Sequence, residues 1–167
     1  AQAWLHRPGL PADAPRFISS KLEELSALAG AWKEGRRPDP ARIKAWSPTE
    51  LLLFLQKLPR ELSAADCGWL DEKLGLTERG NYEILTQWLC LAAGSGYEPV
   101  FARVRQVLSR VGRMKYVRPL YQALGQTASG RKLAREVFAA AAPAYHALTR
   151  RAAEAVIAKW TLPAIVG

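Results

Sequence analysis

The residue types that carry catalysis are few in this 167-residue chain, and none of them falls in a catalytic spacing. The two histidines are His6 and His146, and no H-E-x-x-H or other metal-ligand spacing includes either of them. Cys67 and Cys90 lie inside helical patterns with no histidine near them in the sequence, so we interpret them as buried free thiols. No glycine-rich phosphate loop is present. We therefore predict no catalytic, cofactor-binding or metal-binding residue in this chain.

Positive charge is the clearest chemical signal, and it is concentrated in one stretch. The chain has 24 lysines and arginines against 15 aspartates and glutamates, which gives a net charge of +9. Between Pro99 and Arg135 there is no acidic residue and there are nine basic ones, namely Arg103, Arg105, Arg110, Arg113, Lys115, Arg118, Arg131, Lys132 and Arg135. The rest of the chain is balanced in charge. The excess positive charge of the chain therefore comes from this stretch.

Apolar residues recur at helical spacing along the chain, and no convincing alternating strand appears. We therefore expect helices to carry these cations. Ser47, Pro48 and Glu50 form an N-cap, a first helical position and a capping box, and Ser63 with Asp66 repeats the box pattern. Glycines and prolines between the periodic segments mark the loops. The predicted helices are Phe17–Trp32, Leu51–Leu58, Ala64–Leu74, Tyr82–Ala93, Glu98–Val111, Lys115–Leu124, Arg131–Ala141 and Pro143–Lys159.

These elements predict an all-α fold in which short loops make neighbouring helices antiparallel. We expect a right-handed α-α superhelix, an armadillo- or HEAT-like solenoid, of about eight or nine short helices, although no clean repeat period accompanies it. The proline-rich residues 1–16 are interpreted as an extended linker, residues 17–160 as the helical domain and residues 161–167 as a tail. No apolar run approaches the ~18 residues that a membrane span needs.

Two short motifs carry a resemblance to a known family. The segment from Gly112 to Tyr121, GRMKYVRPLY, resembles the "GRMKF-x-RPL" segment in the C-terminal domain of leukotriene A(4) hydrolase. The segment from Trp4 to Pro11, WLHRPGLP, resembles the "WL-x-x-PGLP" stretch with which that family leaves its catalytic domain. Two further segments, 53–55 and 83–91, follow in the expected order. The resemblance spans the chain from Trp4 to about Ile157. The alternating small and basic residues at 147–159 and then residues 161–167 do not match the family pattern, so the role of the tail 158–167 stays open.

This resemblance implies a function that composition alone does not show. It implies that the chain is the C-terminal domain of a zinc aminopeptidase, similar also to aminopeptidase B, that removes N-terminal residues from small peptides. The zinc and the catalytic groups would lie in a catalytic domain of the same polypeptide, the partner of this domain. The domain itself would form one wall of the substrate channel. Arg113 and Lys115 match the arginine and lysine that bind the peptide carboxylate in the family.

The residues themselves agree with that role but also allow a simpler one. Arg113 follows Gly112 in a tight turn between helices, so its guanidinium can project and take a carboxylate bidentately. Lys115 stands at a helix N-terminus, where the helix dipole disfavours a cation. The simpler interpretation is that both are solvated surface cations. We expect Met114 and Tyr116 to be packing residues.

Two other functions remain open at this point. The first is a free-standing helical module that binds nucleic acid through its basic stretch, although aromatic residues suited to base stacking are few there. The second is an interaction scaffold whose residues 4–10 dock on a protein partner. Membrane binding is not expected. The free cysteines favour a reducing compartment, so we expect a cytoplasmic protein.

Overall fold

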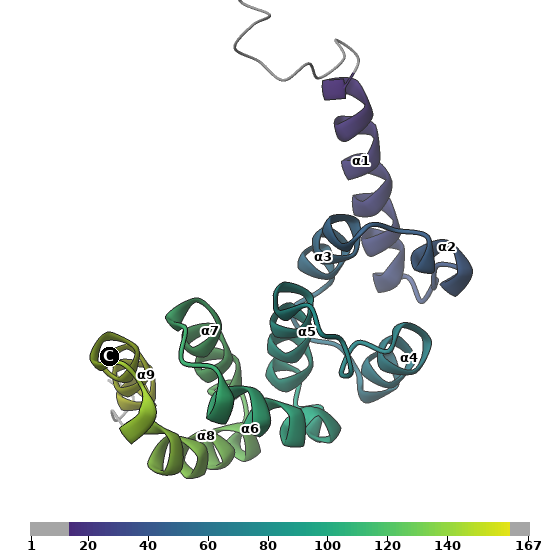
Figure 1. The fold of residues 1–167 in the computed structure, drawn as a ribbon. Helices are drawn as coiled ribbons and strands as arrows, with labels where there is room; N and C mark the ends of the chain where they lie inside the picture. Colours follow the sequence, from purple (N-terminus) through teal and green to yellow (C-terminus); the bar gives the residue numbers. More distant parts are fainter. Residues whose placement is uncertain (1–13, 161–167) are drawn as a thin grey trace, which may run out of the picture. The chain divides into compact units, whose positions relative to one another are not determined.

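The computed structural model describes residues 14–160, with side chains from residue 20 onward, as helices joined by short loops (Figure 1). Residues 14–160 contain no strand, which confirms the all-α prediction. No helix in this range is long and apolar enough to cross a membrane. The elements are α1 (Ala14–Lys33), α2 (Pro40–Lys44), α3 (Pro48–Lys57), α4 (Ala64–Leu74), α5 (Tyr82–Gly94), η2 (Glu98–Val100), α6 (Phe101–Arg110), α7 (Met114–Leu124), α8 (Ala128–Ala141), η3 (Ala142–Ala144) and α9 (Ala147–Lys159).

The chain divides into two compact units, Ala1–Leu58 and Pro59–Gly167. The predicted linker over residues 1–16 and the predicted tail over residues 161–167 lie almost wholly outside the described residues. The exception is the start of α1, which begins at Ala14 rather than at the predicted Phe17. Pro15 permits this earlier start, because proline is tolerated in the first turn of a helix.

In the first unit, α1 packs on α3 through aromatic residues. The rings of Trp32 and Phe54 lie with their centroids 6.4 Å apart, and Trp46 lies 5.1 Å from Phe54, both edge-on. Leu25, Trp32 and Phe54 are almost completely buried. Such edge-on pairs add to the free energy gained by burying the rings. The aromatic cluster therefore fixes α1 against α3.

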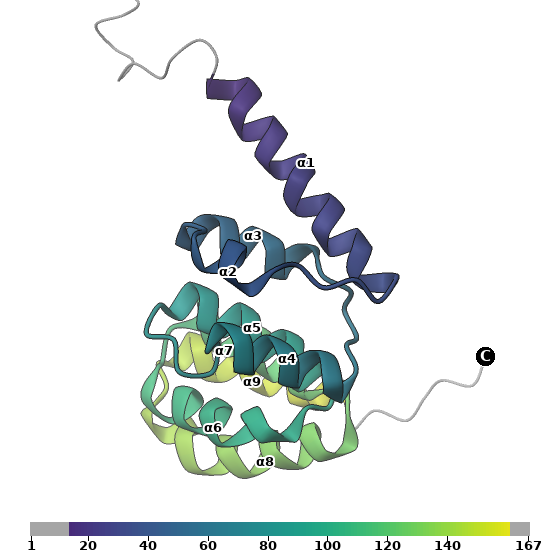
Figure 2. The same ribbon diagram turned by 90° about the vertical axis from the view of Figure 1, so that its right-hand side faces the viewer.

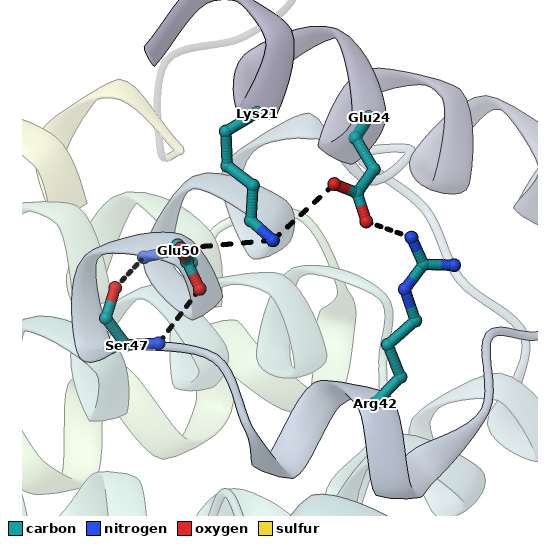
Figure 3. A network of polar contacts seen from close by, with 5 residues as sticks. All are labelled: Lys21, Glu24, Arg42, Ser47 and Glu50. Carbon is teal, nitrogen blue, oxygen red and sulfur yellow. Dashed lines mark hydrogen bonds and ion pairs between the residues drawn. The ribbon is translucent and has the colours of Figure 1, made fainter. Parts of the chain in front are cut away.

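Polar contacts on the same unit join its three helices (Figure 3). Ser47 accepts a hydrogen bond from the backbone N–H of Glu50, and Glu50 accepts one from the N–H of Ser47, which confirms the predicted capping box. The ammonium of Lys21 lies 3.5 Å from Glu24 and 3.9 Å from Glu50, and Arg42 hydrogen-bonds Glu24. Burial alone would raise the pKa of Glu24, but Arg42 and Lys21 outweigh it and lower that pKa.

In the second unit, alternate helices stack side by side. Helix α7 packs against α5 on one side and α9 on the other, while α6 packs on α8 (Figures 1 and 2). This alternation of stacked helices is the packing pattern of an α-solenoid. Its core contains Trp88, Leu89, Leu120 and Tyr121, all fully buried.

One predicted loop and two predicted helices differ most from the structure. The loop predicted around residues 36–40 leads into a short helix, α2, whose N-cap Asp39 accepts a hydrogen bond from the N–H of Ala41. The predicted helix 98–111 is a 3-10 turn followed by α6. The predicted helix 143–159 is wrong at its start. Residue Tyr145 is extended there, and α9 begins at Ala147.

His146 caps α9 rather than standing in the middle of a helix. Its Nδ1 accepts a hydrogen bond from the N–H of Leu148. The break before it lets Tyr145 turn into the core, where its side chain is buried. A buried aromatic side chain and a capped new helix offset the loss of one helical turn.

Candidate functional site

The two predicted carboxylate-binding residues lie at the start of α7, Arg113 as the last residue of the three-residue connection from α6 and Lys115 in the first turn. Helix α6 ends at Arg110, Val111 is extended, and Arg113 is the N-cap of α7 with φ −73° and ψ 122°. The side chain of Arg113 is exposed and makes no capping hydrogen bond. Among the described residues its guanidinium has no hydrogen bond or ion pair, although its charge helps to lower the pKa of Glu83. Its five donors are therefore available to a ligand from outside residues 20–160.

Side chains from the segment that follows α8 hold this turn in place. Thr149 Oγ1 on α9 donates a 3.0 Å hydrogen bond to the carbonyl of Gly112, and Tyr145 Oη donates a 2.7 Å bond to the carbonyl of Leu108. Tyr145 has used its only proton, so the Tyr121 hydroxyl, 3.2 Å away, donates to Tyr145. Burial and this bond raise the pKa of Tyr121. These positioning residues were not predicted, because they lie 24 to 37 positions from their partners.

Lys115 is not free: it forms an ion pair with Glu83 on α5. The hydroxyl of Tyr116 donates a 3.0 Å hydrogen bond to the same oxygen, Glu83 Oε1. The hydrogen bonds from Lys115 and then Tyr116 lower the pKa of Glu83, and the bond to Glu83 raises the pKa of Lys115. The predicted cost of a lysine at a helix N-terminus is therefore offset here by a neighbouring carboxylate, and that cost is no argument for function.

The N-termini of three helices meet at this edge of the second unit. The Glu83–Lys115 pair joins the start of α5 to the start of α7, and the Thr149–Gly112 bond joins the start of α7 to that of α9. Asn81 caps α5 and His146 caps α9, whereas no side chain among the described residues caps α7. An uncapped helix N-terminus attracts anions through its unpaired N–H groups and its dipole. We call this place the α5–α7–α9 edge.

Exposed apolar side chains accompany the cations at the same edge. The large hydrophobic residues exposed within residues 20–160 are Tyr82, Met114 and Leu148, which lie in the first turns of α5, α7 and α9 with exposures of 39%, 42% and 60%. The ring of Tyr82 also lies beside that of Tyr116, with the two ring centroids 5.9 Å apart. The packing role predicted for Tyr116 is confirmed, since it is buried, but that for Met114 is wrong. The α5–α7–α9 edge therefore presents cations that could bind the carboxylate of a ligand, and apolar side chains that could contact its apolar part.

Other cations of the basic stretch have structural partners. Arg103 donates from Nε to the carbonyl of Thr77 at 3.0 Å, and Arg131 donates from Nε to the carbonyl of Gly125 at 2.8 Å. Arg105 lies 3.1 Å from Glu136. These three cations secure loops and neighbouring helices. The basic stretch is thus not one uniform binding surface.

An open hollow of about 530 Å³ lies between α6 and α8, away from the α5–α7–α9 edge. Arg105 and Lys132 line it, but so do Glu98 and Glu136. Two cations and two carboxylates leave it no net charge. The hollow is therefore a poorer anion site than the edge, although it is roomy.

The cysteines have no catalytic arrangement. Both are free, and Cys67 is fully buried, as predicted, while Cys90 is half-buried. Burial raises the pKa of each thiol to about 12. Neither thiol is therefore a thiolate at neutral pH. Residues 20–160 contain no group of three or more histidine, cysteine, aspartate or glutamate side chains that could hold a metal ion.

Comparison with known proteins gives the family. Residues 46–157 match the family described as "Leukotriene A4 hydrolase, C-terminal". The chain is 30% identical over 156 residues to leucine aminopeptidase 2 of Sclerotinia sclerotiorum, covering 91% of this chain and 25% of that protein. It is 32% identical over 154 residues to leucine aminopeptidase 2 of Ajellomyces capsulatus, covering 88% of this chain and 24% of that protein.

A homologue of leukotriene A-4 hydrolase from Botryotinia fuckeliana is 30% identical over 152 residues, with 89% of this chain and 23% of that protein covered. The fold matches that of native yeast LTA4 hydrolase with a TM-score of 0.65 at 18% identity, covering 93% of this chain and 28% of that one. The chain spans about a quarter of the length of the curated relatives that it matches. On the family match and these relatives together, the chain belongs to the leukotriene A4 hydrolase C-terminal domain family.

Proposed function

We propose that this chain is the C-terminal domain of a zinc-dependent, cytoplasmic aminopeptidase that removes N-terminal residues from small peptides. In this proposal it forms one wall of the substrate channel and binds the far carboxylate of the peptide at the α5–α7–α9 edge. The observation that carries the proposal is the unpaired, exposed Arg113 at the uncapped start of α7. The names of the relatives, leucine aminopeptidase and leukotriene A-4 hydrolase homologue, support the peptidase class.

Each feature of the edge has a role in this function. Arg113 takes the carboxylate bidentately, and the free N–H groups in the first turn of α7 add partial positive charge. Lys115 contributes a second charge, and Tyr82 and Met114 contact the apolar part of the peptide. Tyr145 and Thr149 hold the backbone of the turn, so that only the side chain of Arg113 has to be ordered when substrate binds, which reduces the entropic cost of binding.

The zinc is assigned to a catalytic domain outside this chain. It would supply an activated water for attack on the first peptide bond. Residues 20–160 of this chain offer no group of three or more side chains that could hold the zinc. In the proposed reaction, this domain binds and orients the peptide. Its partner is the catalytic domain of the same polypeptide.

Binding of nucleic acid is the poorer alternative on this structure. Tyr116 and Tyr121, two of the three aromatic residues in the basic stretch, are buried and cannot stack on bases. Arg103, Arg105 and Arg131 already have protein partners. Lys115 is paired as well, with Glu83. Five of the nine cations in the basic stretch remain, fewer than the six to ten phosphate contacts that give tight, salt-dependent binding.

The experiment that tests the proposal compares peptides in the intact protein that carries this domain. Each peptide is assayed as the free acid and as the C-terminal amide. We expect Arg113→Ala to raise KM for the acids by about tenfold, the loss of one charge-assisted contact, and to leave the amides unchanged. Arg135→Ala is the matched control, because Arg135 is an exposed arginine on α8. Equal effects of Arg113→Ala on acids and amides would overturn the proposal, and zinc content is measured alongside.

A further inference from the structure

We infer that the hollow between α6 and α8 is a binding site for a small zwitterion, a molecule with one ammonium and one carboxylate on a short, partly apolar body. Free α-amino acids and dipeptides share this chemistry. The hollow lies away from the α5–α7–α9 edge, so the inference goes beyond the proposed function and does not depend on it. Its volume of about 530 Å³ is within the range of about 300–1,000 Å³ that small-molecule sites occupy.

The walls of the hollow are two parallel helices in a fixed register. Helix α6 packs on α8 (Figure 2). The guanidinium of Arg105 lies 3.1 Å from the carboxylate of Glu136, which is 31 positions further along the chain. Just before the two helices, a Cβ built at Gly96 would lie 3.4 Å from the side chain of Thr127, at the same spacing in the sequence. The same spacing at two places means that the helices run in the same direction.

One pair of charges in the hollow is satisfied and another is not. Arg105 and Glu136 form an ion pair between the two walls. Glu98 and Lys132 line the same hollow and are exposed, and neither has a hydrogen bond or an ion pair among the described residues. In the register of the walls, Lys132 stands opposite Phe101, about one helical turn along the groove from Glu98. A free anion and a free cation are therefore held apart in one hollow.

Apolar side chains accompany the two free charges. Phe101 from α6 is half-buried, and Leu133 from α8 is buried apart from the surface that it gives to the hollow. They give the apolar part of a ligand a surface to contact. Because the two carboxylates and the two cations of the lining cancel, the hollow attracts neither anions nor cations as a class. A molecule that carries both charges itself fits this arrangement.

In the complex, the ligand ammonium pairs with Glu98, its carboxylate pairs with Lys132, and its apolar part lies on Phe101. The Arg105–Glu136 ion pair stays formed and joins the two walls about one turn beyond Lys132. The site therefore takes a short ligand rather than a long peptide. Glu98 and Lys132 are exposed to water, so each charge contact is weak, and we expect dissociation constants on the order of millimolar.

The test measures dissociation constants with the intact protein by ligand-observed NMR titration. The probes are leucine, isocaproate, which is leucine without its ammonium, and isoamylamine, which is leucine without its carboxylate. Glu98→Gln should raise Kd for leucine and isoamylamine by about two- to fivefold, the range of one exposed charge contact, and leave isocaproate unchanged. Lys132→Met should raise Kd for leucine and isocaproate by a similar factor and leave isoamylamine unchanged. Binding elsewhere in the intact protein adds a component that neither substitution changes.

A further probe distinguishes the two sources of the ligand. In δ-aminovalerate the ammonium and the carboxylate are separated by as many bonds as in a dipeptide. Tighter binding of δ-aminovalerate than of leucine would assign the site to dipeptides, and the reverse order would assign it to free amino acids. Either order supports a zwitterion site, provided that both Glu98→Gln and Lys132→Met weaken the binding of that ligand.

The matched controls are Glu154→Gln and Lys159→Met, which remove exposed charges on α9, outside the hollow. Both should leave all the dissociation constants unchanged. The inference is wrong if Glu98→Gln and Lys132→Met leave every constant as it was, since the two side chains are then only solvated surface charges. It is also wrong if each substitution weakens all three leucine-related probes alike, because that pattern reports a change in the helices rather than the loss of one charge contact.

Discussion

The two ends of α7 are built in opposite ways. At its N-terminal end, Arg113, Met114 and Lys115 are exposed and the first turn has no side-chain cap. At its C-terminal end, Trp160 lies against Gly125, and Gly130 approaches the carbonyl of Leu124 so closely that no side chain would fit. One end of the helix leaves polar groups available and the other is closed by packing.

Two arginines of the basic stretch, one near each end of α7, also differ in their contacts. Arg131, near the closed end, donates to the carbonyl of Gly125 and stabilises the end of α7. Arg113, at the open end, has no described partner. Charge along the sequence therefore does not tell which arginine binds a ligand. The contact that Arg131 makes assigns it to stability, whereas the exposed Arg113 is left available for the binding role proposed above.

The largest expected effect is at the closed end. A Cβ placed at Gly130 would lie 2.3 Å from the carbonyl oxygen of Leu124, which is backbone and cannot move aside cheaply. We expect Gly130→Ala to lower the free energy of unfolding by about 3 kcal/mol, measured by chemical denaturation. In Gly80→Ala, by contrast, the new Cβ meets nothing within 4 Å, so this control should change stability far less. Similar losses in both variants would contradict the account of the closed end.

A smaller effect is expected behind the open end. Tyr145→Phe removes the hydroxyl that joins Tyr121 to the carbonyl of Leu108 and leaves both without this partner. We expect a loss of about 1–2 kcal/mol in the free energy of unfolding, the cost of unsatisfied buried polar groups. Because the turn before α7 loosens, KM for free-acid peptides should also rise modestly. A variant as stable as the parent would show that the hydroxyls do not hold the turn.

The smallest effect concerns pH. The pKa of Glu83 lies below its ordinary value of 4.5, so its ion pair contributes stability above that value and loses it as the pH falls through the lowered pKa. An NMR titration of the Glu83 carboxyl should give a midpoint below 4.5, and Lys115→Met should move that midpoint upward. An unchanged midpoint in Lys115→Met would mean that the two residues do not interact in solution.

The sequence predicted what depends on neighbouring residues. The caps at Ser47 and Ser63 and the turn between α6 and α7 all follow from local patterns. Arg113 and Lys115 came from the resemblance to the family. The structure shows both at the start of α7, but their role there stays a proposal.

The features that the sequence could not predict depend on contacts between residues far apart in the chain, or on a choice between a helical and an extended backbone. Glu83 and Lys115 are 32 positions apart, so no local pattern pairs them. The split before α9 was missed because the helical periodicity runs through His146, whereas burial of Tyr145 favours an extended residue there. The exposure of Met114 was missed for a related reason, since an apolar residue in the first turn of a helix resembles a core residue by pattern alone.

The most direct test of the central claim is a crystal structure of the intact protein with a non-hydrolysable peptide that has a free carboxylate. We predict that this carboxylate lies within hydrogen-bond distance of the Arg113 guanidinium, with the Lys115 ammonium turned from Glu83 towards it. A peptide whose carboxylate is bound elsewhere, with Arg113 in solvent or against another domain, would contradict the claim that the α5–α7–α9 edge is the carboxylate site.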